Sequence, residues 1–183
     1  SDICRVNIDT GELTEVQASD HDYAVSAPPS RIGIAGSFGV SPSGNYVEAT
    51  RSRVDQAPVS LLLDRAGQTI MTLETADVSG LPDHWQWPES VKLKAADGTT
   101  DTWGVVFRPS DFSADKQYPV IDCSYHSFMP IGAFNNNLVG AMGYLPPAAL
   151  AELGFIVVMI NSRETGLRDS AFNASNASLA EKY

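Results

Sequence analysis

The sequence predicts a mixed fold, in which antiparallel strands are followed by the first strands and helix of an α/β sheet. Two observations predict it. Before residue 76, apolar and polar residues alternate in short segments separated by turns rich in Gly, Asn and Asp, which is typical of antiparallel sheets. After residue 145, a short helical segment leads into an uninterrupted apolar, β-branched segment over residues 155–160, which is typical of an α/β crossover.

The first half contains three turn signals between alternating segments. The first turn, Asp9-Thr10-Gly11, lies between strands over residues 5–8 and 13–16. The second, at residues 41–45, is followed by a strand over residues 45–52. The third, at residues 64–67, lies between strands over residues 59–63 and 69–73. Each combines a residue that tolerates positive φ with strands of period two. We therefore expect an all-β unit over residues 1–80. The segments have no fixed period, so a complete repeat array is not predicted.

Residues 81–90 are predicted to be a linker, because they contain Pro82 and Pro88 and show no periodicity. Trp85 and Trp87 lie within this segment. They could form a ligand platform, but apolar anchors that pack the linker onto a domain are the favoured interpretation.

The second half is predicted to begin with one more hairpin and then to change to α/β order. Residues 90–95 and 102–107 flank an Asp-Gly turn, and residues 111–116 are a polar loop. A strand over residues 118–125 begins at a proline. A helix over residues 146–153 then precedes a strand over residues 155–160. Gly154 is placed to end that helix. We expect the last strand to be buried on both faces and to leave an unpaired apolar edge. Through that edge the isolated chain would associate with itself or with the remainder of a longer polypeptide.

Composition excludes several classes of function. The chain is 43% hydrophobic and 19% charged, so it can bury a core. Its net charge of −10 disfavours nucleic acid as a partner. No apolar stretch reaches the ~20 residues that a membrane helix needs, so no membrane segment is expected. No Cys or His spacing is typical of a metal site, and no cofactor is expected. Cys123 lies in an apolar run and is interpreted as a buried free thiol.

Several short motifs occur in a fixed order through most of the chain. They are S-P-S-G-N-Y at residues 41–46, L-L-L-D at 61–64, D-G-T at 97–99, P-S-D-F at 109–112, Y-P-V-I at 118–121 with Tyr125 after it, and L-A-E-L-G-F-I-V-V at 150–158. In this order they resemble the prolyl oligopeptidase / dipeptidyl peptidase IV family of serine peptidases. The first two are similar to the last blades of that family's β-propeller, and the others to the beginning of its α/β-hydrolase domain.

The resemblance implies three parts: residues 1–80 as partial propeller blades, residues 81–90 as a linker, and residues 91–183 as the incomplete N-terminal part of a hydrolase domain. It also implies peptide-bond hydrolysis through an acyl-enzyme, with a Ser-His-Asp triad and a serine on a G-x-S-x-G turn. No G-x-S-x-G occurs in this sequence; the nearest similar stretch, at residues 39–44, has the wrong spacing. We therefore expect a fragment that lacks the nucleophile, Asp and His and is inactive alone. The resemblance to this family also favours a periplasmic or secreted location.

Tyr125 is the one catalytic residue that the resemblance places in this chain. In the family, the tyrosine after this strand donates its hydroxyl to the oxyanion hole, where such a donor lowers the barrier by ~3–4 kcal/mol. The residues alone also fit a tyrosine that ends a strand with its hydroxyl in water. His126, Ser127 and Phe128 replace the family's usual small residues and Gly-Pro pair, and Glu164 replaces the glycine after Arg163. The sequence therefore leaves open the interpretation that the protein is an inactive or divergent member of this family.

Other interpretations also remain open at this point. The chain could belong to a non-catalytic β-rich interaction module with a degenerate hydrolase half, or to an esterase of the same fold. His126 is interpreted as a loop residue with local polar contacts, and Asp122 as a solvent-facing strand residue. Asn173 and Asn176 begin glycosylation sequons that matter only in a eukaryotic secretory setting.

Overall fold

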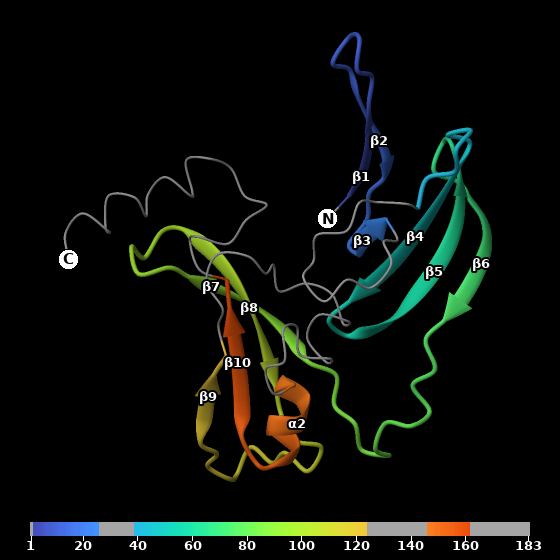
Figure 1. Cartoon of the computed structure of the whole chain (residues 1–183). Helices are drawn as coiled ribbons and strands as arrows, with labels where there is room; N and C mark the ends of the chain where they lie inside the picture. The colour runs from blue at the N-terminus through green and yellow to red at the C-terminus, as the bar shows by residue number, and fades with distance from the viewer. Residues whose placement is uncertain (1, 26–38, 124–145, 162–183) are drawn as a thin grey trace. The chain divides into compact units, whose positions relative to one another are not determined.

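Figure 1 shows the computed structural model, which describes residues 2–25, 39–123 and 146–161. The chain forms two compact units. The first unit ends at Gly80 and the second unit begins at Leu81. Within the described residues, no helix combines the length and apolar character that crossing a bilayer requires.

The first unit is all β. It contains the hairpin of β1 (Ile3–Val6) and β2 (Leu13–Gln17), and a sheet of β3 (Asp22–Val25), β4 (Tyr46–Arg53), β5 (Gln56–Asp64) and β6 (Thr69–Thr75). The sheet order is β3-β4-β5-β6 with every pair antiparallel. Strands adjacent in sequence are thus adjacent in the sheet, and the β1–β2 and β5–β6 hairpins are those that the turn signals predicted.

The predicted turns are confirmed. Gly11, Gly44 and Gly67 have φ values of +72°, +68° and +89°, the left-handed region that glycine adopts without strain. At the β5–β6 turn, the Asp64 side chain accepts hydrogen bonds from the backbone N–H groups of Ala66 and Gln68 at 2.8 and 2.9 Å. Such a side-chain bond to the following backbone stabilises a turn locally.

The core of the first unit lies on one face of the sheet. Ala49, Leu61 and Leu63 are buried there, and Ile3 of β1 and Val16 of β2 pack against them. The hairpin therefore covers this face. The β5–β6 turn approaches the hairpin so closely that a Cβ at Gly67 would collide with the backbone of Val16.

Strand β6 is an outer strand of the described sheet and is irregular. Its pairing with β5 shifts at two places, which leaves Ile70 and Leu73 as extra residues without a direct partner on β5. Ile70, Met71 and Leu73 are 49%, 51% and 43% exposed. The strand thus combines two bulges with an exposed apolar strip.

The second unit has a mixed sheet. Its elements are β7 (Glu89–Lys94), β8 (Asp101–Phe107), β9 (Val120–Asp122), α2 (Pro147–Glu152) and β10 (Ile156–Ile160), and the sheet order is β7-β8-β10-β9. Strand β8 is antiparallel to β7 and β10, whereas β10 is parallel to β9. The predicted hairpin, helix and strand–helix–strand crossover are confirmed, and α2 belongs to the connection between the parallel strands.

The expected edge at residues 155–160 is wrong. Strand β10 is hydrogen-bonded on both sides, by β8 and by β9 (Figure 1). The expected burial on both faces is also wrong, because only Val157 is fully buried in β10 and the other four residues are half-buried. The physical reason is non-local pairing: β8 occupies the side of β10 that the sequence order left open. The outer strands of the described sheet are β7 and β9.

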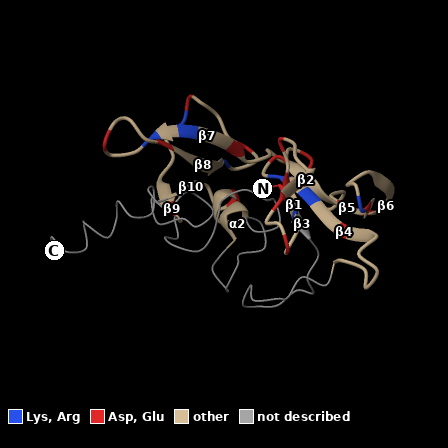
Figure 2. Ribbon diagram, turned by 90° about the horizontal axis from the view of Figure 1, so that it is seen from above, with Lys and Arg blue, Asp and Glu red and all other residues tan. Residues whose placement is uncertain are grey.

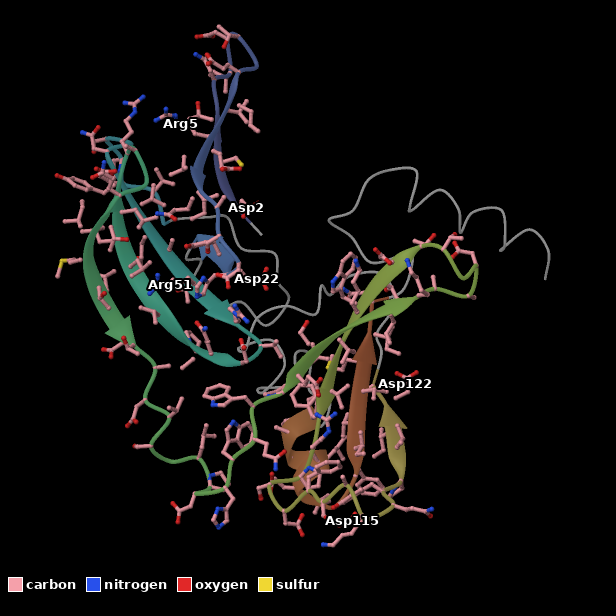
Figure 3. The ribbon with its side chains drawn as sticks, turned by 180° about the vertical axis from the view of Figure 1, so that it is seen from behind. Asp2, Arg5, Asp22, Arg51, Asp115 and Asp122 are labelled. Carbon is pink, nitrogen blue, oxygen red and sulfur yellow. The ribbon has the colours of Figure 1, made fainter. Side chains whose placement is uncertain are left out.

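These two outer strands carry charge. Lys92 and Lys94 lie on β7, where Figure 2 shows the basic residues in blue, and Asp122 lies exposed on β9 (Figure 3). Charged side chains on an outer strand oppose the addition of a further strand. Tyr118, Pro119 and Cys123 of the expected strand lie outside β9, and Ser124 and Tyr125 lie outside the described residues.

Two close contacts hold the second unit together. The Glu152 carboxylate at the end of α2 accepts hydrogen bonds from the backbone N–H and the hydroxyl of Ser110, at 3.0 and 2.8 Å. Gly104 of β8 lies against β10 so closely that an added Cβ would be 2.8 Å from the Met159 carbonyl oxygen. Helix α2 ends at Glu152, and Gly154 follows the end of the helix with a φ of +94°, as predicted.

Candidate functional site

The carboxyl ends of β9 and β10 form the candidate functional site. In open α/β sheets, ligands bind where parallel strands end, because the chain leaves the sheet there in loops that carry functional groups. Strands β9 and β10 are parallel and pair Val120 with Ile156 and Asp122 with Val158, so both end at the same margin of the sheet. The last described residues at this margin are Cys123 and Asn161.

Backbone hydrogen bonds hold both departure points. The N–H of Cys123 donates to the carbonyl oxygen of Val158 at 2.8 Å, which extends the β9–β10 ladder by one residue. The N–H of Asn161 donates to the carbonyl oxygen of Trp103 at 2.9 Å, which extends the β8–β10 ladder in the same way. The last described residues at both ends, Cys123 and Asn161, are therefore held to the sheet.

A side chain adds a further bond at the end of β10. The Thr102 hydroxyl donates to the carbonyl oxygen of Asn161 at 2.6 Å, and Thr102 is only 6% exposed. A buried hydroxyl is stable only when it is hydrogen-bonded, so this bond explains a polar residue on an interior strand. The sequence did not predict a role for Thr102.

Tyr125, the residue predicted to be catalytic, lies outside the described residues. Other residues singled out in the sequence also lie outside them: His126, Ser127, Phe128, Arg163 and Glu164, and the sequons at Asn173 and Asn176. The oxyanion role of Tyr125 therefore stays a prediction. In sequence, Tyr125 lies two positions after Cys123, the last described residue beyond β9.

Cys123 is unsuited to act as a nucleophile. It is a free cysteine and half-buried, so the expectation of a buried thiol holds in part. Burial, and then the negative charge of Asp122, raise the pKa of the Cys123 thiol. A raised pKa lowers the fraction of thiolate, which is the reactive form. Asp122 is exposed, in agreement with its interpretation as a solvent-facing residue.

A second cluster contains the residue types of a catalytic triad but not its geometry. Ser19 Oγ and Asp20 Oδ1 both lie 3.0 Å from Nδ1 of His21, and Nε2 of His21 lies 2.9 Å from Oε1 of Gln56. A triad places the serine and the aspartate on opposite ring nitrogens. Here they share one nitrogen, so the cluster stabilises the turn before β3. Among the described residues, no group of three or more His, Cys, Asp or Glu side chains is arranged to hold a metal ion.

The linker tryptophans contact each other. The rings of Trp85 and Trp87 meet edge to face, with centroids 6.4 Å apart. The backbone N–H of Trp85 donates to the Pro82 carbonyl oxygen at 2.9 Å. The pair forms a local apolar cluster, which favours anchoring over an open ligand platform.

One face of the β7–β8 hairpin carries a cluster of ion pairs around Asp101, whose pKa is strongly lowered. The ammonium groups of Lys92 and Lys94 lie 2.7 and 2.5 Å from the carboxylate of Asp101. Hydrogen bonds from these two lysines lower the pKa of Asp101 to about 2. Lys92 also lies over the Trp103 ring, 5.4 Å from its centroid. All these groups are at least partly exposed and pair with one another, so they stabilise the hairpin surface and do not form a reactive site.

Comparison with known proteins identifies the fold. No family model matches the chain, and no curated protein matches it. Among solved structures, a candidate dipeptidyl aminopeptidase IV from Bacteroides ovatus superimposes with a TM-score of 0.64 at 24% sequence identity. The match covers 94% of this chain and 23% of that protein, so this chain spans about a quarter of its length. Nearly the whole chain, both units included, therefore shares the fold of one part of a dipeptidyl aminopeptidase IV-like protein.

Proposed function

We propose that this chain is part of a serine peptidase of the prolyl oligopeptidase / dipeptidyl peptidase IV type. The fold likeness over 94% of the chain carries the proposal, because it includes both units in a single protein. The order of the sequence motifs supports it independently, since they resemble the same family.

The architecture of the two units agrees with this proposal. A propeller blade is a four-stranded antiparallel sheet, which is the size and connectivity of β3–β6. The parallel pairing of β9 and β10 through α2 is the crossover from which an α/β-hydrolase sheet is built. In this proposal the first unit belongs to the propeller, the second unit begins the hydrolase domain, and the rest of the polypeptide completes both.

The proposed chemistry is acyl transfer. A serine on a G-x-S-x-G turn elsewhere in the polypeptide attacks the peptide carbonyl, His accepts its proton, and Asp orients that His. Tyr125 donates its hydroxyl to the oxygen on which negative charge develops. The substrate is a peptide, and the second unit contributes the margin of the sheet that Tyr125 follows in sequence.

The test uses the complete polypeptide encoded by the gene, with the 183-residue chain beside it. We expect a fluorophosphonate probe to label one serine outside residues 1–183 in the complete polypeptide and to leave the short chain unlabelled. Chromogenic dipeptide amides and simple esters would then separate a peptidase from an esterase. Absence of labelling in the complete polypeptide, or labelling within residues 1–183, would contradict the proposal.

The role of Tyr125 has its own test. Tyr125→Phe removes only the hydroxyl, and loss of one oxyanion donor lowers kcat by roughly 10²–10³-fold. Tyr46→Phe is the matched control, because Tyr46 is 49% exposed in the first unit. Equal kcat values for the two variants would remove Tyr125 from the mechanism.

A further inference from the structure

One face of the β1–β2 hairpin is apolar and open to solvent. Val6 of β1 lies opposite Leu13 of β2, and Cys4 lies opposite Glu15. Cross-strand partners, and residues two apart on one strand, project from the same face of a sheet. Val6 is 53% exposed and Leu13 is 64% exposed, and Cys4 and Glu15 are exposed as well. We call this surface of Cys4, Val6, Leu13 and Glu15 the hairpin face.

The hairpin face points away from the core of the first unit. Ile3 and Val16 project from the other face of the hairpin and pack against the core. Arg5 also lies on that other side, where its guanidinium donates to the Arg65 carbonyl oxygen at 3.3 Å. Figure 1 shows the hairpin extending beyond the end of the sheet formed by β3 to β6. The contacts of the first unit therefore bury one face of the hairpin and leave the hairpin face to solvent.

A surface of this kind is typical of an interface. Two strands alone are marginally stable in water, and burial of their apolar faces supplies most of the missing stability. Within the described residues, β1 and β2 pair only with each other. Ile8, which follows the end of β1, adds an apolar side chain that is 94% exposed. Single exposed apolar residues need no explanation, whereas adjacent ones on a projecting element indicate a surface that another body covers.

Charge and length indicate what covers the hairpin face. Glu15 lies on the face, and Asp9 and Glu12 lie in and beside the turn of the hairpin. A second copy would bring like charges together, since the chain has a net charge of −10. An apolar surface with Lys or Arg opposite Glu15 would be complementary. The matched dipeptidyl aminopeptidase IV-like structure is long enough to supply one, because this chain covers only 23% of it.

We propose that the hairpin face is an interface with the part of the same polypeptide that lies outside residues 1–183. That part presents apolar side chains to Val6 and Leu13, and Lys or Arg to Glu15. The inference rests on the proposed function only because it requires a polypeptide longer than this chain. It does not require peptidase activity.

Cys4 is a native reporter of this interface. The experiment measures how fast N-ethylmaleimide alkylates Cys4 in the complete polypeptide, folded and in urea, by mass spectrometry of the peptide that contains Cys4. Because Cys4 is exposed in the chain by itself, an open hairpin face predicts similar rates in both conditions. A covered face predicts that the folded protein reacts about tenfold or more slowly. This protection should not change on dilution, because the covering surface belongs to the same molecule.

Substitutions test the apolar and the charged parts of the contact separately. Leu13→Asp would bury a carboxylate without a partner, so we expect the protection of Cys4 to be lost. Glu15→Lys would place like charges opposite each other, and we expect alkylation of Cys4 to accelerate several-fold. Thr72→Asp is the matched control, since it adds the same charge at an exposed position on β6 and should leave the protection intact.

A photoreactive residue identifies the covering surface. With benzoylphenylalanine in place of Glu15, we expect cross-links to residues outside 1–183 of the same molecule. Cross-links within residues 1–183, protection that disappears on dilution, or a folded Cys4 that reacts as fast as in urea would each overturn the inference. Protection of Cys4 in a polypeptide that the fluorophosphonate probe does not label would contradict the peptidase function and still support the interface.

Discussion

Gly67 is the position at which one added methyl group should destabilise the first unit most. Its φ is +89°, and a Cβ there would collide with the carbonyl oxygen, carbonyl carbon and Cγ1 of Val16. Two of these three atoms belong to the backbone of β2 and cannot rotate away. The hairpin would therefore have to move from the core face that it covers.

The expected magnitude has two parts. A non-glycine residue in the left-handed region costs roughly 1–2 kcal/mol. Forcing an extra carbon into a packed site costs roughly 1–3 kcal/mol. Gly67→Ala should thus lower the free energy of unfolding of the first unit by about 2–5 kcal/mol.

The assay is native-state hydrogen exchange at the amides of Leu61 and Leu63, whose side chains are buried in the core of the first unit. This local measurement avoids assuming that both units unfold together. Because every 1.4 kcal/mol is a factor of ten, exchange should accelerate by about 30-fold or more.

Gly44→Ala is the control for the collision. Gly44 has a φ of +68°, but no atom lies within 4 Å of its would-be Cβ. This variant carries the backbone penalty without the collision. If exchange in Gly67→Ala is no faster than in Gly44→Ala, the close packing of the turn on the hairpin is wrong.

Three further predictions concern packing and charge. Leu63→Ala should cost about 2–5 kcal/mol in the free energy of unfolding, since Leu63 is 0% exposed, and denaturation followed by circular dichroism measures it. Gly104→Ala should cost roughly 1–3 kcal/mol, because the new Cβ would press on the β10 backbone, and exchange at the β10 amides reports it. Asp101 should titrate near its lowered pKa of about 2, so its contribution to stability is present above its ordinary pKa of 3.8 and is lost as pH falls toward 2. Substituting Lys92 and Lys94 by Met should move that titration, followed by NMR, back toward 3.8.

Clear results would contradict each of these predictions. A Leu63→Ala protein with unchanged unfolding would mean that the core lies elsewhere. Unchanged exchange in Gly104→Ala would mean that β8 and β10 are not in close contact. The ion pairs would be excluded as the cause of the lowered pKa of Asp101 by either of two results. One is a pKa that does not rise when both lysines are substituted, and the other is a pKa that does not rise in high salt.

Local structure was predictable where turn chemistry is explicit. The hairpins at Gly11, Gly67 and Gly98 each place glycine at a positive φ between alternating strands, and all three formed as expected. The β4–β5 turn at Val54 and Asp55 was not predicted, because no glycine or proline adjoins Asp55 and Val54 is typical of strands. Strand β3, only four residues long and beginning with Asp22, was also missed.

Non-local pairing could not be predicted from the sequence. The composition of residues 155–160 predicted a strand that is buried on both faces and unpaired along one edge. Instead, β10 lies between β8 and β9 and is mostly half-buried. A periodicity reports which residues prefer burial and does not report which strand lies alongside. In the candidate site, the carboxyl ends of the strands were predictable, whereas the bond from Thr102 depends on two residues 59 positions apart.

The two bulges of β6 affect how the protein behaves at high concentration. Growth of a fibril requires a straight row of evenly spaced N–H and C=O groups to which an incoming chain can bind. Each bulge at Ile70 and Leu73 interrupts that spacing, so an incoming segment can pair with only a few residues before it loses register. We therefore expect the exposed apolar residues of β6 not to seed a fibril from this strand.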